Sequence, residues 1–264
     1  MNPRITLVGN SHVAALRRGW DHIKDGFDVD LQFFAANSTL YGQLELSKDK
    51  QFGMHDLQKY HPRHVSFLKD HFGDVTVDLS SSDAVVLVGT GIRAKDFVRN
   101  LSRFSIDGIR DIEGLPPMSR EAFDSFAPSI YQKGPLPEYW MNWSGPRVYI
   151  LVPPIPSVHC PIEDKRYKVW AQFGQTAQNN IGFLQHYHDI VRAELATQNV
   201  HLISQPWDIL SENGLTRAQY HDGAKRLDET LADYADDYHH MNPTYGAKVL
   251  RHVLQTVQTD CVPA

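Results

Sequence analysis

The sequence has 264 residues, of which 42% are hydrophobic and 22% are charged, and its formal net charge is −5. This length and composition are ordinary for a globular protein with a sizeable core, and the negative charge argues against a nucleic-acid binder, which would carry a basic stripe. Cys160 and Cys261 do not make a disulfide framework, and no secretory leader or membrane-length apolar stretch is present, so we expect a cytoplasmic protein without membrane partners.

The first expected element is a buried strand, followed by a tight turn and an amphipathic helix. Ile5–Val8 is a continuous apolar run, Gly9 permits the turn, and helically spaced apolar residues follow from Val13. Ser11 stands on the turn, so its hydroxyl would leave the carboxyl edge of a sheet near the positive end of a helix dipole, which suits a nucleophile. Serine is also a common N-cap of helices, and this stretch alone favours the cap.

Further strands alternate with helices along the chain. Apolar runs predict strands at 29–36, 84–88, 147–152 and 200–204, and an apolar stripe predicts one long helix over 164–197. Another helix is expected around Leu227, Leu231 and Tyr234, and 48–74 is left unassigned. The alternation predicts an α/β fold with three layers around a five-stranded, parallel, doubly wound (flavodoxin-like) sheet, whose sites lie at the carboxyl ends of the strands.

The segment around 92–146 is expected to be an insertion into a single domain that spans 1–264. Prolines interrupt long helices in it, and Trp140 and Trp143 lie near its end. Because the segment leaves the sheet just after Gly91, at the edge where Ser11 lies, it could form a lid whose tryptophans bind a sugar ring. The alternative, that its aromatic side chains pack on the body of the protein, is favoured on general grounds.

A second polar block lies near the end of the chain, just before an expected amphipathic helix. Residues 236–242 read Asp-Asp-Tyr-His-His-Met-Asn. An acid three residues before a histidine can orient its imidazole, and together with Ser11 it makes a triad in the order Ser, Asp, His. The tandem residues leave two registers open, Asp237 with His240 or Asp236 with His239.

The two blocks together resemble those of the GDSL/SGNH hydrolase family. Residues 9–12 read Gly-Asn-Ser-His where the family usually has Gly-Asp-Ser-Leu, and the second block resembles its Asp-x-x-His motif. The resemblance implies an SGNH-hydrolase-like fold with Ser11, Asp237 and His240 as the catalytic residues. It favours this register because an Asn commonly stands two residues after the catalytic His in the family, as Asn242 does after His240.

Acyl transfer also needs hydrogen-bond donors for the developing oxyanion. The Ser11 amide is one candidate, and the resemblance implies a second at Gly42, after the second strand. The family's third donor, an Asn after the third strand, is absent because Gly91 stands in its place. Asn37 or main-chain amides around Gly91 are the candidate substitutes.

The expected function is that of a serine esterase that removes a short acyl group, such as acetyl, from a small-molecule or carbohydrate ester without a cofactor. One alternative is an acyltransferase that uses the same triad, with a sugar hydroxyl in place of water. Another is a degenerate module that binds a ligand without turnover, which the missing Asn would favour. Close histidine pairs such as His61 and His64 lack a zinc-site pattern, so no metal is expected.

Overall fold

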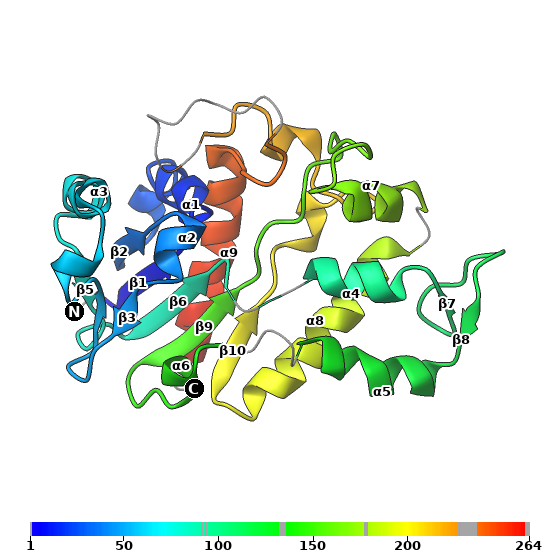
Figure 1. The fold of residues 1–264 in the computed structure, drawn as a ribbon, viewed down its shortest axis with the longest axis horizontal. Coiled ribbons are helices and arrows are strands. Elements are labelled where there is room, and N and C mark those ends of the chain that lie inside the picture. Colours follow the sequence, from blue (N-terminus) through cyan, green and yellow to red (C-terminus); the bar gives the residue numbers. More distant parts are fainter. Residues whose placement is uncertain are drawn as a thin grey trace.

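The computed structural model describes residues 2–90, 92, 94–131, 136–176, 179–225, 227 and 237–261. Its centre is a five-stranded, all-parallel sheet in the order β2-β1-β6-β9-β10 (Figure 1). The strands are β1 (Arg4–Gly9), β2 (Asp30–Ala35), β6 (Ala84–Val88), β9 (Arg147–Leu151) and β10 (Val200–Ile203). The first strand of the sheet lies between the second and the third, which is the flavodoxin-like doubly wound order, so the predicted five-stranded α/β fold is confirmed.

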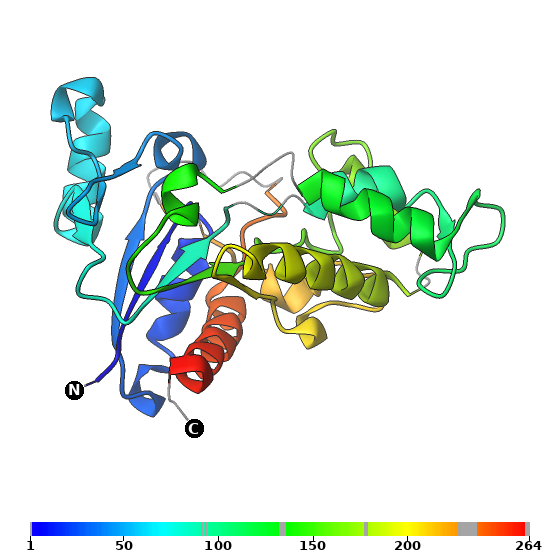
Figure 2. The same ribbon diagram turned by 90° about the horizontal axis from the view of Figure 1, so that it is seen from below.

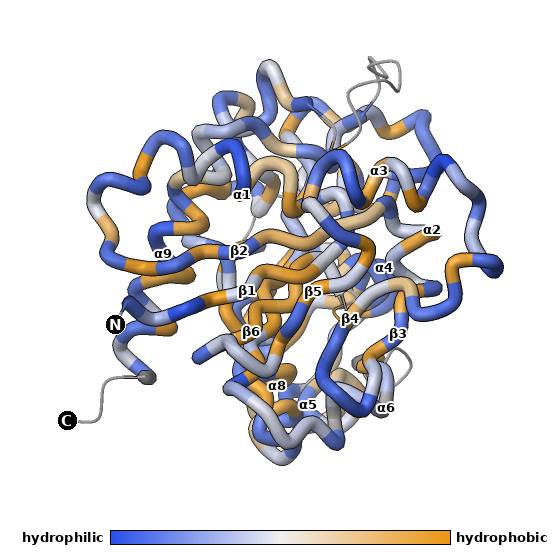
Figure 3. Tube along the Cα trace, turned by 90° about the vertical axis from the view of Figure 1, so that its left-hand side faces the viewer, coloured by the Kyte–Doolittle hydropathy of each residue, from blue (hydrophilic) through white to orange (hydrophobic). Residues whose placement is uncertain are grey.

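The two central strands are apolar almost throughout. Every residue of β6 and all but the first of β1 are buried, and Figure 3 shows these strands as hydrophobic segments inside a more hydrophilic outer chain. Continuous apolar runs of this kind are typical of parallel strands that are covered on both faces. Gly9 is paired with Ala35 on one side and with Val88 on the other, so three strands end at the same edge. Ser11 follows β1 at that edge.

Helices α1 (Val13–Trp20) and α9 (Pro243–Cys261) pack closely side by side (Figures 1 and 2). Glycine makes the contact possible, because a Cβ added at Gly246 would overlap the main-chain oxygen of Ala15, and one added at Gly19 would overlap the backbone of α9. The two helices begin just after Ser11 and just after His240. Their close packing therefore fixes the distance between these two residues, which are far apart in the sequence.

The prediction of a single helix over 164–197 is wrong, because α7 (Lys168–Gln175) and α8 (Asn180–Ala196) are separate helices. Arg110, which is 1% exposed, lies at the break and donates hydrogen bonds to the main-chain oxygen of Thr176 (3.1 Å) and to Asn180 Oδ1 (3.1 Å). Asn180 Nδ2 donates in turn to the main-chain oxygen of Phe173 (2.8 Å). Such bonds from polar side chains compete with a continuous helix, and the apolar stripe does not reveal them.

The expected insertion after β6 contains two substantial helices. Its elements are α4 (Ala94–Leu101), β7 (Ser105–Ile106), β8 (Pro117–Met118), α5 (Arg120–Tyr131) and α6 (Glu138–Met141). Helix α4 contacts α7, and α5 contacts α8, so most of this segment packs on the body of the protein (Figure 1). Of the described residues in this segment, those that border the cavity described below lie at its start and are Ile92, Ala94, Lys95 and Asp96.

The remaining elements lie outside the large sheet. They are α2 (Ser38–Tyr41), α3 (Pro62–Phe72), the antiparallel strands β3 (Glu45–Leu46), β4 (Gln51–Gly53) and β5 (Thr76–Asp78), and the short 3-10 helices η1 (Lys24–Gly26), η2 (Leu57–Lys59), η3 (Trp207–Ile209) and η4 (Ala218–Tyr220). The helix expected around Leu227 falls mostly outside the described residues. Within the described part of the chain, no helix is both long and apolar enough to cross a bilayer.

Replacing Arg110 with Met should destabilise the fold strongly. The guanidinium also donates to the main-chain oxygen of Ser102 (2.5 Å), and its loss would leave several buried acceptors without a donor. Each unsatisfied buried group costs about 1–3 kcal/mol, so we expect the free energy of unfolding in urea to fall by roughly 3 kcal/mol. The exposed Arg103 is the matched control, and Arg103→Met should change stability by less than about 0.5 kcal/mol. Equal effects of the two substitutions would contradict this role of Arg110.

Candidate functional site

The turn after β1 holds Ser11 at the carboxyl edge of the sheet. Asn10 fixes this turn, because its Nδ2 donates to the main-chain oxygen of Gly89 (2.8 Å) and its Oδ1 accepts from the N–H of His12 (3.1 Å). The N-cap residue of α1 is His12, not Ser11, and it makes no capping hydrogen bond through its side chain. The N-cap interpretation of Ser11 is therefore wrong, and its hydroxyl is available for another contact.

The structure brings Ser11, His240 and Asp237 into one chain of hydrogen bonds. Ser11 Oγ lies 2.8 Å from His240 Nε2, and His240 Nδ1 lies 2.6 Å from Asp237 Oδ2. The other carboxylate oxygen of Asp237 accepts the main-chain N–H groups of His239 (3.2 Å) and His240 (3.3 Å). The carboxylate therefore orients both the loop and the imidazole. The side chains of His240 and Asp237 are only 18% and 12% exposed, which strengthens the electrostatic interaction between them.

Several contacts hold the loop that carries Asp237 and His240. The Tyr238 N–H donates to the hydroxyl of Tyr167 (2.9 Å), and His221 Nε2 lies 2.7 Å from the main-chain oxygen of Asp237. After the loop, Asn242 Oδ1 accepts the N–H of Tyr245 (3.0 Å), in the first turn of α9. The Asn that selected the register from sequence thus anchors the helix directly behind the histidine.

His239 has a different environment from His240. Its ring packs against Tyr167, with 4.9 Å between the ring centroids, and no hydrogen bond joins it to Ser11. Burial lowers the pKa of His239 to about 4, so it is neutral at pH 7. Asp236, its partner in the alternative register, lies outside the described residues.

His12 is a component of the site that the sequence patterns do not indicate. Its ring centroid lies 5.4 Å from that of His240, and its Nδ1 is buried without a hydrogen-bond partner among the described residues. Burial, reinforced by the neighbouring His240, lowers the pKa of His12 to about 3. A neutral imidazole therefore flanks His240, and only its position directly after Ser11 could have drawn attention to it.

Ser11 and His240 open into a cavity of about 500 Å³, a size typical of small-molecule sites. One part of its wall is apolar and consists of Ile92, Pro153, Pro154, Ile155 and Trp170. Another part is polar and includes Ser38, Lys95 and Asp96. The double proline follows the fourth strand of the sheet and Trp170 lies on α7, so segments far apart in the sequence form this cavity.

The residues expected to supply oxyanion donors differ in how the structure uses their polar groups. Asn37 is exposed and caps α2, where its Oδ1 accepts the N–H of Leu40 (2.9 Å). The N–H of Gly42 is also used by α2, because it donates to the main-chain oxygen of Ser38 (3.2 Å). The N–H of Gly42 is therefore engaged within α2, whereas the cap uses only the oxygen of the Asn37 amide, and Asn37 is not among the residues that line the cavity. Gly91 lies outside the described residues. The main-chain N–H of Ser11 has no hydrogen-bond partner among the described residues and remains available.

The two tryptophans expected to bind substrate do not line this cavity. Trp140 is 1% exposed and packs on Phe52, with 5.7 Å between the ring centroids. Trp143 packs on Trp140, and its Nε1 donates to the main-chain oxygen of Pro146 (2.7 Å). The structure therefore favours the alternative in which these aromatic side chains pack on the body of the protein over the one in which they bind a sugar ring. Large aromatic side chains contribute most to stability when they are buried.

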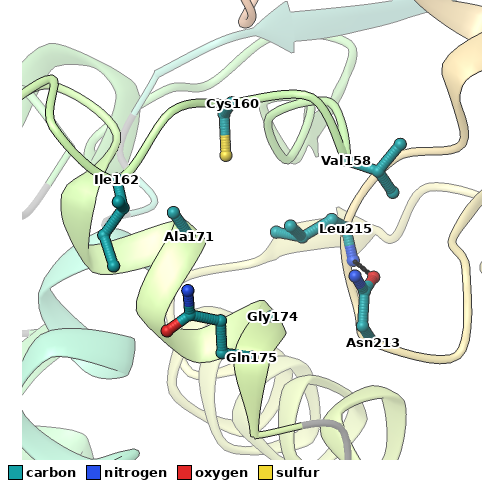
Figure 4. A pocket seen from close by; sticks show the side chains of 8 residues that line it. All are labelled: Val158, Cys160, Ile162, Ala171, Gly174, Gln175, Asn213 and Leu215. Carbon is teal, nitrogen blue, oxygen red and sulfur yellow. Dashed lines mark hydrogen bonds between the residues drawn. The ribbon is translucent and has the colours of Figure 1, made fainter.

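A second cavity, of about 230 Å³, lies between α7 and the loops at 158–162 and 213–215 (Figure 4). Its walls include the thiol of Cys160, and burial raises the pKa of that thiol to about 11. The thiol is thus protonated at neutral pH and is a poor nucleophile. Within the described part of the chain, no group of three or more histidine, cysteine or acidic residues could hold a metal ion.

Stability should fall steeply in mild acid, because the pKa values of three histidines lie well below the usual 6.5. The pKa is about 3 for His12 and His188 and about 4 for His239, with burial as the main cause in each. Between pH 6.5 and 4 these histidines are protonated in the unfolded chain but stay neutral in the folded one. The stability that they contribute is therefore fully present above pH 6.5 and is lost as the pH falls below it. Each histidine lowers the free energy of unfolding by at most about 1.4 kcal/mol per pH unit, so the three together lower it by at most about 4 kcal/mol per pH unit.

Urea unfolding at pH 7.5, 6.0 and 5.0 measures this dependence. His188→Gln should make the slope of stability against pH shallower, whereas the same change at the exposed His22 should not. A stability that stays constant from pH 6.5 to 4.5 would contradict the burial of neutral histidines.

A scan against protein-family models finds no match for this sequence, and a search of curated proteins finds no matching relative.

Proposed function

We propose that this protein is a serine esterase of the SGNH type that cleaves a small acyl ester with Ser11, His240 and Asp237. The hydrogen-bonded chain Asp237–His240–Ser11 at an open cavity is the observation that carries this proposal. A nucleophile within hydrogen-bond reach of a base, with the base oriented by a third group, is the arrangement that covalent catalysis requires. The resemblance of both sequence blocks to GDSL/SGNH hydrolases supports the same conclusion.

In the first half-reaction, Ser11 Oγ attacks the ester carbonyl carbon while His240 Nε2 takes the hydroxyl proton. Asp237 holds the Nδ1–H tautomer and stabilises the imidazolium that forms. The tetrahedral intermediate collapses when the carbon–oxygen bond to the alcohol breaks, and His240 gives its proton to the departing oxygen. The product of this step is the alcohol and an acyl group on Ser11.

Water then attacks the acyl group in the second half-reaction. His240 takes a proton from the water, the bond to Ser11 Oγ breaks, and the proton returns to Ser11 as the carboxylic acid leaves. The Ser11 N–H is the donor available to the oxyanion in both steps. Because a missing side-chain donor typically costs about a hundredfold or more in turnover, we expect slow cleavage of generic esters.

Covalent labelling with a fluorophosphonate tests the proposal. We expect stoichiometric labelling, with the modified peptide containing Ser11, and we expect acetyl esters to be cleaved faster than octanoyl esters. Ser38→Ala is a suitable control, since Ser38 lines the same cavity but is not hydrogen-bonded to His240. A protein that neither reacts with the probe nor hydrolyses any ester would overturn the proposal. Faster cleavage of octanoyl esters would overturn the preference for a short acyl group.

A further inference from the structure

A lysine carries positive charge into the wall of the cavity that holds Ser11. Lys95 lies in the first turn of α4 and lines the cavity together with Ser11 and His240. It is the one lysine or arginine among the described residues of this wall. Two of the histidines in the wall, His12 and His239, are neutral at pH 7 because burial lowers their pKa values.

The ammonium group of Lys95 is not paired with a carboxylate. Its Nζ donates to the main-chain oxygen of Arg166 (2.5 Å), and no carboxylate of the described residues lies within 4.0 Å of it. An ammonium group has three donors, so two remain for other partners. Lys95 can therefore bind a ligand without giving up its existing hydrogen bond.

The nearest acidic residues do not balance this charge, because each is bonded to an arginine. Asp96 lies 2.9 Å from Arg99, and Asp164 lies 2.5 Å from Arg166. Each of these two carboxylates therefore has a guanidinium as a direct partner, whereas Lys95 has no carboxylate at this distance among the described residues. Burial, followed by the like charge of Arg99, lowers the pKa of Lys95 despite the two carboxylates. An anionic ligand in the cavity would give Lys95 the direct negative partner that it lacks among the described residues.

The rest of the wall limits the size and polarity of that ligand. Ile92, Pro153 and Trp170 are apolar surfaces, and Trp170 is 3% exposed, with an indole N–H that has no hydrogen-bond partner in the described part of the chain. A volume of about 500 Å³ holds a small molecule. The cavity therefore combines a nucleophile, an apolar surface, the ammonium group of Lys95 and the carboxylate of Asp96, which is paired with Arg99.

We propose that the substrate is an anionic ester, a short acyl ester whose carboxylate or phosphate group binds the ammonium of Lys95. This inference rests on the proposed esterase function and adds the class of substrate. An ammonium group is a point charge that accepts either kind of anion, whereas an arginine fork would favour planar, two-point contacts. The structure thus assigns Lys95 as a residue that determines specificity.

Matched esters test the charge preference. The first set has three acetyl esters, which are the anionic 4-acetoxybenzoate and 4-acetoxyphenyl phosphate and the neutral 4-acetoxybenzamide. The second set compares phenyl hydrogen adipate, whose carboxylate lies on the acyl side, with the neutral compound in which that carboxylate is replaced by an amide. We expect kcat/KM to be at least about tenfold higher for at least one anionic ester than for its neutral counterpart, because a charged hydrogen bond contributes about this much binding energy. The difference should come mainly from a lower KM. The ester that shows the preference also distinguishes carboxylate from phosphate.

Variants of Lys95 show whether the preference depends on this residue. Lys95→Met should abolish the ratio between anionic and neutral esters, and Lys95→Arg should retain most of it. Lys168→Met is the matched control, because Lys168 is exposed on α7 and does not line the cavity, and it should leave the ratio unchanged. A preference that survives Lys95→Met would overturn the assignment.

Equilibrium binding separates this inference from the esterase proposal. Ser11→Ala can be titrated with the same esters by calorimetry, and we expect tighter binding of an anionic ester, lost when Lys95→Met is added. Charge-dependent binding without any turnover in the wild type would overturn the esterase and retain the anion site. Turnover of all the esters without a charge preference, in rate or in binding, would overturn the anion site and retain the esterase.

Discussion

Ser11→Ala should lower kcat/KM for a short acetyl ester by roughly 10⁵-fold, because loss of a triad nucleophile removes the covalent pathway and leaves only the contribution of binding and the oxyanion donor. The fold should survive, since the Ser11 hydroxyl contacts His240 at the edge of a cavity and makes no contact that holds the sheet together. Initial rates with an acetyl ester, measured beside the thermal midpoint of each protein, give both quantities.

Ser38→Ala is the matched control for this experiment. It also removes a serine hydroxyl from this cavity but leaves the hydrogen bond between Ser11 and His240 intact. We expect the rate of this variant to stay within about tenfold of the wild type. A Ser11→Ala protein that is folded and retains the wild-type rate would show that another group carries the reaction.

Asp237→Asn should have the second-largest effect, a loss of roughly 10⁴-fold in turnover, similar to that of the same change in a serine protease triad. The amide is nearly isosteric with the carboxylate, so the loop should keep its shape. However, it carries no negative charge to stabilise the imidazolium of His240, and it no longer enforces the Nδ1–H tautomer. Turnover of an acetyl ester measures the loss, and an unchanged KM would locate it in the chemical step.

His239→Gln distinguishes the two registers that the tandem residues allow. His239 packs on Tyr167 and is not hydrogen-bonded to Ser11, so its replacement should lower turnover by less than about tenfold. A loss comparable to that of Asp237→Asn would mean that His239, not His240, is the base in the functional state.

Local sequence patterns determine much of the fold. The five strands of the large sheet follow from apolar runs that begin or end within about two residues of the observed bounds. The signal is clearest for β1 and β6, because a parallel strand buried on both faces must be apolar. The alternation of these runs with helical segments leads to the doubly wound order. The two polar blocks at 9–12 and 236–242 likewise indicate Ser11 and an Asp/His pair, but their spacing leaves two registers open, and the resemblance to GDSL/SGNH hydrolases favours Asp237 with His240.

Periodicity fails where polar side chains make long-range hydrogen bonds. The break between α7 and α8 depends on Arg110, which lies 70 residues before its partner Asn180 in the chain. The same limit applies to Gly42, whose N–H is used within α2. Nothing in its spacing shows whether a donor is free or already engaged.

The sequence alone thus determined the sheet, the order of its strands and the residue types at its carboxyl edge. Only the tertiary structure decided that the hydroxyl of Ser11 meets His240 instead of capping α1, because that contact joins residues 229 positions apart through the packing of α1 on α9. It also decided that Trp140 is buried and that Lys95 lines the cavity. Whether a side chain outside the apolar strands is buried, and which distant groups it meets, depends on which segments pack together in space, and a local pattern along the chain does not encode that.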